Sequence, residues 1–165
     1  MIRTFIAVEL PADVRAALSD LIDRMAMRWP ERGVRWVKGD NMHLTLRFLG
    51  DTDEALVANL GAGLDAIASG TAPFELRLAG TGCFPNPRRP RVVWVGLEDP
   101  EDRLLPLQKQ VEQLARACGW EREKRAFRPH LTLGRVRERT RPPEGDWLAA
   151  PEPMAFRVET VQLIE

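Results

Sequence analysis

The 165-residue sequence contains no tyrosine, two cysteines and two histidines, and only three of its 24 basic residues are lysines. Cys83 and Cys118 are too few and too isolated for a disulfide scaffold or a cysteine-rich metal knuckle, which favours buried or inert thiols. No apolar run approaches the roughly 20 residues that a membrane-spanning helix needs. The first residues also lack the long apolar segment of a secretory signal. The sequence therefore predicts a cytoplasmic globular protein with no membrane segment.

The chain also lacks an excess of either charge, because 24 acidic residues balance 24 basic ones. A neutral molecule has no overall field to attract long nucleic acids, so any contact with nucleic acid is expected to be short and local. The basic residues are mostly arginine, whose planar guanidinium suits two-point contact with phosphate. No glycine-rich phosphate loop of the Walker or dinucleotide-binding type is present.

The length and the 44% content of hydrophobic residues are those of one domain, residues 1–165, with a packed core. Alternating and helical apolar patterns predict a mixture of strands and amphipathic helices. The expected strands are residues 3–10, 34–37, 43–49, 74–78, 91–97, 130–136 and 155–164, and the expected helices are 12–28, 53–68 and 100–119. Residues 80–90 and 141–153 are expected to be loops. Strands that alternate polar and apolar residues indicate sheets covered on one face, and so an α+β fold of two small lobes.

The strongest signal is a repeated tetrapeptide. His-Leu-Thr-Leu occurs at residues 43–46 and again at 130–133, and the two copies hold both histidines of the chain. Successive side chains of a strand point to opposite faces, so each copy places His and Thr on one face and both Leu on the other. The spacing is near half the chain length. We therefore expect an approximate two-fold arrangement in which two matched polar faces meet across a cleft.

Two histidines provide the groups that acid–base catalysis requires. With an unperturbed pKa of ~6.5, one imidazole can be neutral and the other protonated near neutral pH. Phosphodiester cleavage uses such a pair: one ring takes a proton from the attacking oxygen, and the other protonates the departing oxygen. Thr45 and Thr132 can donate hydrogen bonds to phosphate oxygens. The alternatives at this point are an ordinary half-buried strand sequence, a metal site that lacks its third ligand, and a cysteine nucleophile without a paired base.

Arginine and aromatic residues near the motifs are candidates for substrate binding. Arg47 lies two residues past Thr45, and Arg135 lies two residues past Leu133; either would extend the polar face and hold a phosphate. Phe48 and Phe84 are candidates for stacking on an unpaired base. Two basic clusters, Arg88, Arg89 and Arg91 and then Arg122, Lys124, Arg125 and Arg128, either hold a nucleic-acid backbone or form a solvated surface.

The paired motifs, with further landmarks, resemble the two-histidine (2H) phosphoesterases, and within them the RNA 2′,3′-cyclic phosphodiesterases, also called 2′-5′ RNA ligases. The resemblance covers nearly the whole chain. Its landmarks are residues 3–11, 41–50, 82–85, 91–96 and 128–135. The two motifs are specific, and the other segments support them.

The resemblance implies a bilobal α+β fold in which two antiparallel sheets carry helices on their outer faces. A pseudo-two-fold axis relates the two intertwined lobes, and the active site lies in the central cleft. It implies no metal and no cofactor, with His43 as proton donor, His130 as proton acceptor, and Thr45 and Thr132 binding the phosphate. Arg47, Arg128, Arg135, Phe48 and Phe84 are the expected substrate-binding residues. The expected partners are RNA 3′ ends or nucleotides that bear a cyclic phosphate, and a monomer is expected.

The implied reaction is hydrolysis of a terminal 2′,3′-cyclic phosphate to a 2′-phosphate, with 2′-5′ ligation as the same chemistry run toward joining. Family members commonly continue into a tail containing Ser, Gly and Tyr, whereas this sequence stops at Glu165 and has no Tyr, so the resemblance leaves contacts from such a tail open. Two other functions stay open. One is hydrolysis of a small cyclic nucleotide or of ADP-ribose cyclic phosphate, and the other is a non-catalytic module that binds RNA phosphates.

Overall fold

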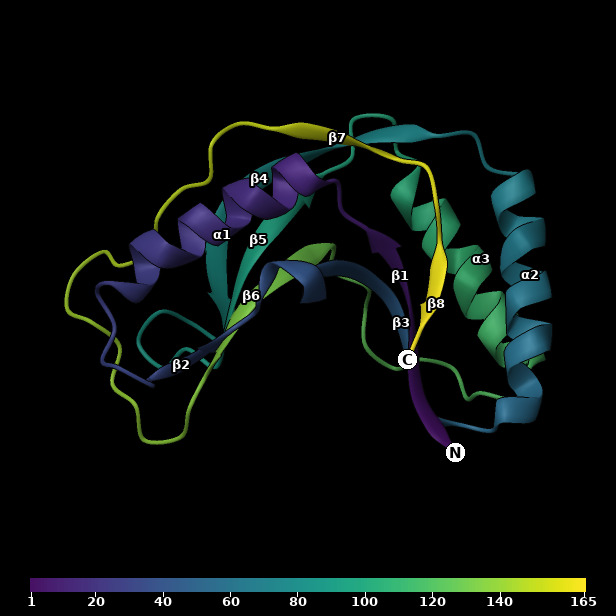
Figure 1. Cartoon of the computed structure of the whole chain (residues 1–165), viewed down its shortest axis with the longest axis horizontal. Coiled ribbons are helices and arrows are strands. Elements are labelled where there is room, and N and C mark those ends of the chain that lie inside the picture. The colour runs from purple at the N-terminus through teal and green to yellow at the C-terminus, as the bar shows by residue number, and fades with distance from the viewer.

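Two antiparallel sheets form the centre of the structure, a computed structural model that describes residues 1–165 (Figure 1). The first sheet has three strands in the order β3-β1-β8, and the second has five in the order β2-β6-β5-β4-β7. The strands are β1 (Ile2–Glu9), β2 (Val34–Trp36), β3 (His43–Thr52), β4 (Phe74–Phe84), β5 (Val92–Glu98), β6 (His130–Val136), β7 (Ala155–Val158) and β8 (Gln162–Ile164). Every strand pair is antiparallel. The predicted α+β class with two antiparallel sheets is confirmed.

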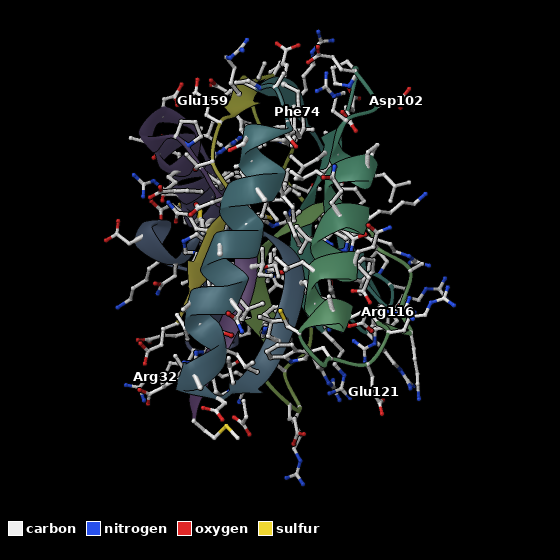
Figure 2. All side chains as sticks on the ribbon, turned by 90° about the vertical axis from the view of Figure 1, so that its right-hand side faces the viewer. Arg32, Phe74, Asp102, Arg116, Glu121 and Glu159 are labelled. Atoms are coloured by element: carbon white, nitrogen blue, oxygen red, sulfur yellow. The ribbon has the colours of Figure 1, made fainter.

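Three amphipathic α-helices cover these sheets: α1 (Ala12–Ala26), α2 (Val57–Ser69) and α3 (Leu104–Ala117). Figure 1 shows α1 over the five-stranded sheet, and α2 and α3 beside the three-stranded sheet. Figure 2 looks onto α2 and α3, which lie side by side. The buried residues of α1 recur at helical spacing and give one apolar stripe: Val14, Leu18, Leu21, Ile22 and Met25. None of the helices combines the length and the apolar character needed to cross a membrane.

The two halves of the chain repeat one plan. In each half, a strand leads into a helix, and a motif strand then returns antiparallel to the first strand: β1-α1-β3 and β5-α3-β6. The halves also exchange elements. Helix α3 belongs to the second half but packs on β3 of the first, where the Gln108 amide donates to the Leu46 carbonyl at 3.3 Å. One continuous apolar cluster of 31 buried residues joins them.

Strand β4 is longer than predicted, because it continues to Phe84 through residues expected to form a loop. Gly82 faces the Trp94 indole on β5, and a Cβ atom there would lie 2.4 Å from the ring. Glycine was interpreted as a sign of a loop, whereas in this sheet it leaves space for a large neighbouring side chain. The predicted loop at 80–90 is therefore wrong over its first half.

Two other predicted boundaries also differ from the structure. The predicted strand 155–164 is two strands, of which β7 pairs with β4 in one sheet and β8 pairs with β1 in the other. Helix α3 begins at Leu104 rather than near residue 100, because Asp102 has a positive φ of 52° and interrupts the helical backbone. The Asp99 carboxylate accepts the Leu104 N–H at 2.7 Å and satisfies the start of the helix.

Two glycines of α2 provide a test of the packing between α2 and α3. A Cβ atom at Gly63 would lie 2.2 Å from Leu114 of α3, whereas one at Gly61 would meet nothing within 4 Å. Gly61→Ala should raise the free energy of unfolding by about 1 kcal/mol through helix propensity. Gly63→Ala should lower it by about 1 kcal/mol, because overpacking outweighs that gain. Urea denaturation of both variants checks this, and equal stabilisation by both would contradict the close contact.

Candidate active site

The two histidines begin the two motif strands. His43 is the first residue of β3 and His130 is the first residue of β6, and these strands are in contact where the two sheets meet. Both rings are half-buried, as are Thr45 and Thr132. The four motif leucines are buried, which matches the alternation expected for strands. Each sheet thus presents one His and one Thr on the same face.

A β-bulge ends the alternation at the same position of each motif. Along β3, Ala7 lies opposite Thr45 and Ile6 opposite Arg47, so Leu46 is an extra residue. In β6, Leu133 is likewise the extra residue, since its neighbours Thr132 and Gly134 lie opposite consecutive residues of β5. A bulge puts two successive side chains on one side of the sheet. The residue after the bulge pair, Phe48 in β3 and Arg135 in β6, therefore returns to the face of the histidine.

The bulge places Arg47 on the core side, so the predicted position of its side chain on the histidine face is wrong. Its guanidinium is 8% exposed and pairs with Glu112 of α3 at 2.6 Å. It also donates to the carbonyls of Phe48 at 2.8 Å and Glu121 at 2.6 Å, and lies 3.5 Å from Glu123. Arg47 thus ties β3 to α3 and to the segment that leads toward His130, and it is not available to hold a substrate phosphate.

Aromatic rings flank His43. Phe5 on the neighbouring strand β1 meets the His43 ring edge-on, with centroids 5.8 Å apart and planes at 65°. Phe48 lies 5.9 Å from Phe5 and is 62% exposed, an unusual exposure for a phenylalanine. The structure therefore brings the predicted stacking residue Phe48 to the His43 face, with its ring open to solvent.

The His130 ring is held by a hydrogen bond as well as by aromatic contacts. Its Nδ1 atom lies 2.6 Å from the Arg128 carbonyl, which can only accept, so Nδ1 carries the proton in the neutral ring. Phe84 meets the ring edge-on at 5.4 Å and 86°, and the Arg128 guanidinium lies 5.9 Å from the Phe84 ring. Phe84 and Arg128, both sequence candidates, are thus gathered at His130. The remaining ring nitrogen, Nε2, is left as a proton acceptor.

Sequence reasoning missed three residues of these faces. Trp94 lies 6.5 Å from the His130 ring and 5.1 Å from Phe84, and its strand pairing with Thr132 is a tertiary property. Arg35 lies directly opposite Arg135 across the β2-β6 pair. Glu9 lies opposite His43 across the β1-β3 pair. The sequence contains no local signal for any of these contacts.

The structure gives little support to the two alternative chemistries considered from the sequence, a metal site and a cysteine nucleophile. No cluster of three or more His, Cys, Asp or Glu side chains is arranged to hold a metal ion. Burial raises the pKa of the Cys83 thiol, which keeps it protonated and weakens it as a nucleophile. Two surface hollows of about 480 and 580 Å³ are lined by residues 120–125 with Arg47, and by residues 88–91 with 136–142. Neither is lined by a motif histidine.

The amino-acid sequence is similar to those of known phosphoesterases. The family model described as LigT like Phosphoesterase matches twice, at residues 8–94 and 95–164. His43 and His130 each lie 35 residues beyond the start of their match, at residues 8 and 95. The chain is 36% identical over 136 residues to an RNA 2′,3′-cyclic phosphodiesterase of Methanothermobacter thermautotrophicus, covering 82% of this chain and 72% of that protein. It is 39% identical over 141 residues to the enzyme of that name from Thermus thermophilus, covering 81% and 68%.

Solved structures show the same similarity. A crystal structure of a Thermus thermophilus protein superposes with a TM-score of 0.81 at 31% identity, covering 99% of this chain and 88% of that one. Escherichia coli LigT complexed with 3′-AMP superposes with a TM-score of 0.68 at 31% identity, covering 98% and 86%.

Arg47 offers a test of the link between β3 and α3. Arg47→Ala leaves the largely buried Glu112 carboxylate and two carbonyls without their partner, and should lower the free energy of unfolding by about 3 kcal/mol. Arg77→Ala is the matched control, because Arg77 forms an exposed pair with Glu75 at 3.0 Å and should cost less than about 1 kcal/mol. Denaturant titration of both variants measures the difference. Equal small losses would mean that the Arg47 network contributes no more than a surface pair.

Proposed function

The chain belongs to the LigT-like phosphoesterase family, and we propose that it hydrolyses the 2′,3′-cyclic phosphate at an RNA 3′ end to a 2′-phosphate. The observation that carries this proposal is the equivalence of His43 and His130, each the first residue of a motif strand in one of two repeated halves. The two relatives described above are named RNA 2′,3′-cyclic phosphodiesterase, which supports a cyclic phosphate on RNA as the substrate. The complex of E. coli LigT with 3′-AMP supports a nucleotide with a 3′ phosphate as the core of the substrate.

In this mechanism His130 is the general base. The hydrogen bond from Nδ1 to the Arg128 carbonyl fixes the neutral tautomer, so Nε2 takes a proton from the attacking water. The water oxygen forms a bond to phosphorus while the bond from phosphorus to the 3′ oxygen breaks. The 2′ ester bond stays intact, so the product carries a 2′-phosphate. A positioned base of this kind contributes on the order of 10²–10⁴-fold in rate.

His43 is the general acid and gives its proton to the departing 3′ oxygen. Glu9, opposite His43 on β1, accepts a hydrogen bond from the Gln162 amide at 3.0 Å, and this carboxylate lies on the same face as the ring. A carboxylate at this position can accept a hydrogen bond from the ring. After one turnover His130 holds the proton and His43 has lost one, and exchange with solvent restores both.

Threonine and arginine stabilise the charge on the phosphate. The Thr45 and Thr132 hydroxyls donate to its non-bridging oxygens from the two motif strands, and Arg128 supplies positive charge beside Phe84 and His130. Arg135 adds positive charge farther along β6, on the face that carries Thr132. Phe84 contacts the His130 ring, and Phe48 lies beside Phe5, which contacts the His43 ring. Phe48 and Phe84 offer ring faces for the terminal base. This acid–base chemistry needs no metal ion. The same groups acting in reverse would join a second RNA hydroxyl, which is 2′-5′ ligation.

Replacement of either histidine tests the activity. His43→Ala and His130→Ala should each lower kcat on an RNA ending in a 2′,3′-cyclic phosphate by about 10²–10⁴-fold. The assay contains EDTA, and phosphatase treatment with chromatography identifies the phosphate position in the product. Asp40→Ala, an exposed residue before β3, serves as the control and should keep full activity. Near-normal turnover in either histidine variant, or activity that requires added Zn²⁺ or Mg²⁺, would refute the mechanism.

The pH dependence separates the two roles. The base must be deprotonated and the acid protonated, so wild-type kcat/KM should rise and then fall with increasing pH. The residual activity of His130→Ala should lose the rising limb at low pH, because no base remains to titrate. His43→Ala should instead lose the falling limb at high pH. The reversed pattern, measured on the same RNA, would exchange the assigned roles.

A further inference from the structure

Six exposed arginines surround one of the surface hollows, at the end of the five-stranded sheet where β6 finishes. We call them the arginine basin: Arg88, Arg89, Arg91, Arg137, Arg139 and Arg141. The hollow has a volume of about 580 Å³. The connection between β4 and β5 forms one wall, and the residues after β6 form the other (Figure 1). Segments far apart in the sequence are thus brought to one surface.

Backbone hydrogen bonds fix the two walls of the basin relative to each other. The Val136 N–H donates to the Arg91 carbonyl at 2.9 Å, and the Arg91 N–H donates to the Phe84 carbonyl at 2.7 Å. The Arg137 N–H donates to the Gly33 carbonyl at 2.9 Å. The arginines therefore project from an ordered backbone, which favours binding because less conformational entropy is lost.

The charge of the basin has no counterpart within the protein. Glu138 is the only acidic residue that lines the hollow, and none of the six guanidinium groups is in an ion pair. The whole chain has a net charge of zero, so this concentration of positive charge is a local feature. Like charges held close together destabilise the folded state. A bound polyanion would offset that repulsion.

Two further arginines lie between the basin and His130. Arg35 and Arg135 are directly opposite each other across β2 and β6, on the face that carries Thr132. Like charges at directly opposed positions destabilise a sheet, so folding gives no reason for this pair. From His130 to Val136 the strand spans about 20 Å. Positive charge therefore follows β6 from the catalytic face to the basin.

We propose that the arginine basin, with Arg35 and Arg135, binds the phosphate backbone of the RNA strand upstream of the reacting 3′ end. This inference rests on the proposed hydrolysis of an RNA-terminal cyclic phosphate, because that reaction fixes the 3′ end at His130. Guanidinium groups contact phosphate at two points, and contacts with phosphate carry no information about base sequence. The protein therefore prefers an oligonucleotide to a mononucleotide and discriminates little among sequences.

The other basic hollow is a weaker site for the strand. Its basic side chains alternate with Glu121 and Glu123, and Arg47 is occupied by Glu112. A phosphate backbone would meet both carboxylates there. The basin has one carboxylate among six arginines, so its surface is nearly uniformly positive.

Binding of RNA to the intact protein tests the basin directly. The triple variant Arg88→Ala, Arg89→Ala and Arg139→Ala should bind a labelled single-stranded RNA of about 12 nucleotides about tenfold or more weakly, by fluorescence anisotropy. The slope of log K against log salt should decrease in magnitude by about 2, because three phosphate contacts are lost. The control variant Arg3→Ala, Arg77→Ala and Arg116→Ala removes the same charge from other exposed positions and should bind as wild type does; Figure 2 shows Arg116 on α3.

Turnover provides the second measurement. The basin variant should lose kcat/KM on the RNA by a factor similar to its loss of binding, while kcat/KM on a 2′,3′-cyclic mononucleotide stays unchanged. An equal loss on both substrates, unaltered RNA binding, or a larger loss of binding on replacing Arg122, Lys124 and Arg125 would each overturn the assignment. Displacement of the RNA by polyglutamate of matched charge would point to an acidic protein instead. Basin-dependent RNA binding without turnover of any cyclic phosphate would reject the hydrolysis and keep the docking surface.

Discussion

The β-bulge at the last residue of each motif is the constraint on which the candidate site depends. Because Leu46 and Leu133 are extra residues in their strand pairs, the position that follows each of them stays on the core side, and the side chain after that returns to the histidine face. Each strand thus presents a His, a Thr and one further residue to the site. In β3 that residue is Phe48 and in β6 it is Arg135, so the same backbone supplies an aromatic ring on one side and a cation on the other.

The core side of the two bulges also differs, and this difference distinguishes the two halves. The residue that directly follows the extra leucine is Arg47 in β3 and Gly134 in β6. Arg47 binds Glu112, whereas a Cβ atom at Gly134 would lie 2.7 Å from the Trp36 ring. One half therefore uses the position to hold α3, and the other uses it to pack a tryptophan closely. Two copies of one supersecondary plan have thus acquired unequal surroundings.

The same asymmetry extends to how each histidine is held. His130 is oriented by a backbone carbonyl and by Phe84, and positive charge continues from its strand toward the arginine basin. His43 is flanked by Phe5 and faces Glu9, which the C-terminal strand β8 contacts through Gln162. One ring thus has its tautomer set by a backbone carbonyl, and the other lies across the strand pair from a carboxylate. The exposed positive charge is therefore concentrated on the β6 side.

The sequence alone determined the α+β class, most strands and helices, and the two motifs, because these follow from local periodicity and from a repeated tetrapeptide. It misplaced Arg47, since strict alternation takes no account of a bulge, which becomes visible only when Thr45 and Arg47 are paired with consecutive residues of β1. It also took Gly82 for a loop residue, although that glycine makes room for Trp94. The positions of Trp94 and Arg35, and the joining of the Arg88, Arg89 and Arg91 cluster with Arg137, Arg139 and Arg141, were decided only by tertiary structure, because strand pairing brings together residues that share no local pattern.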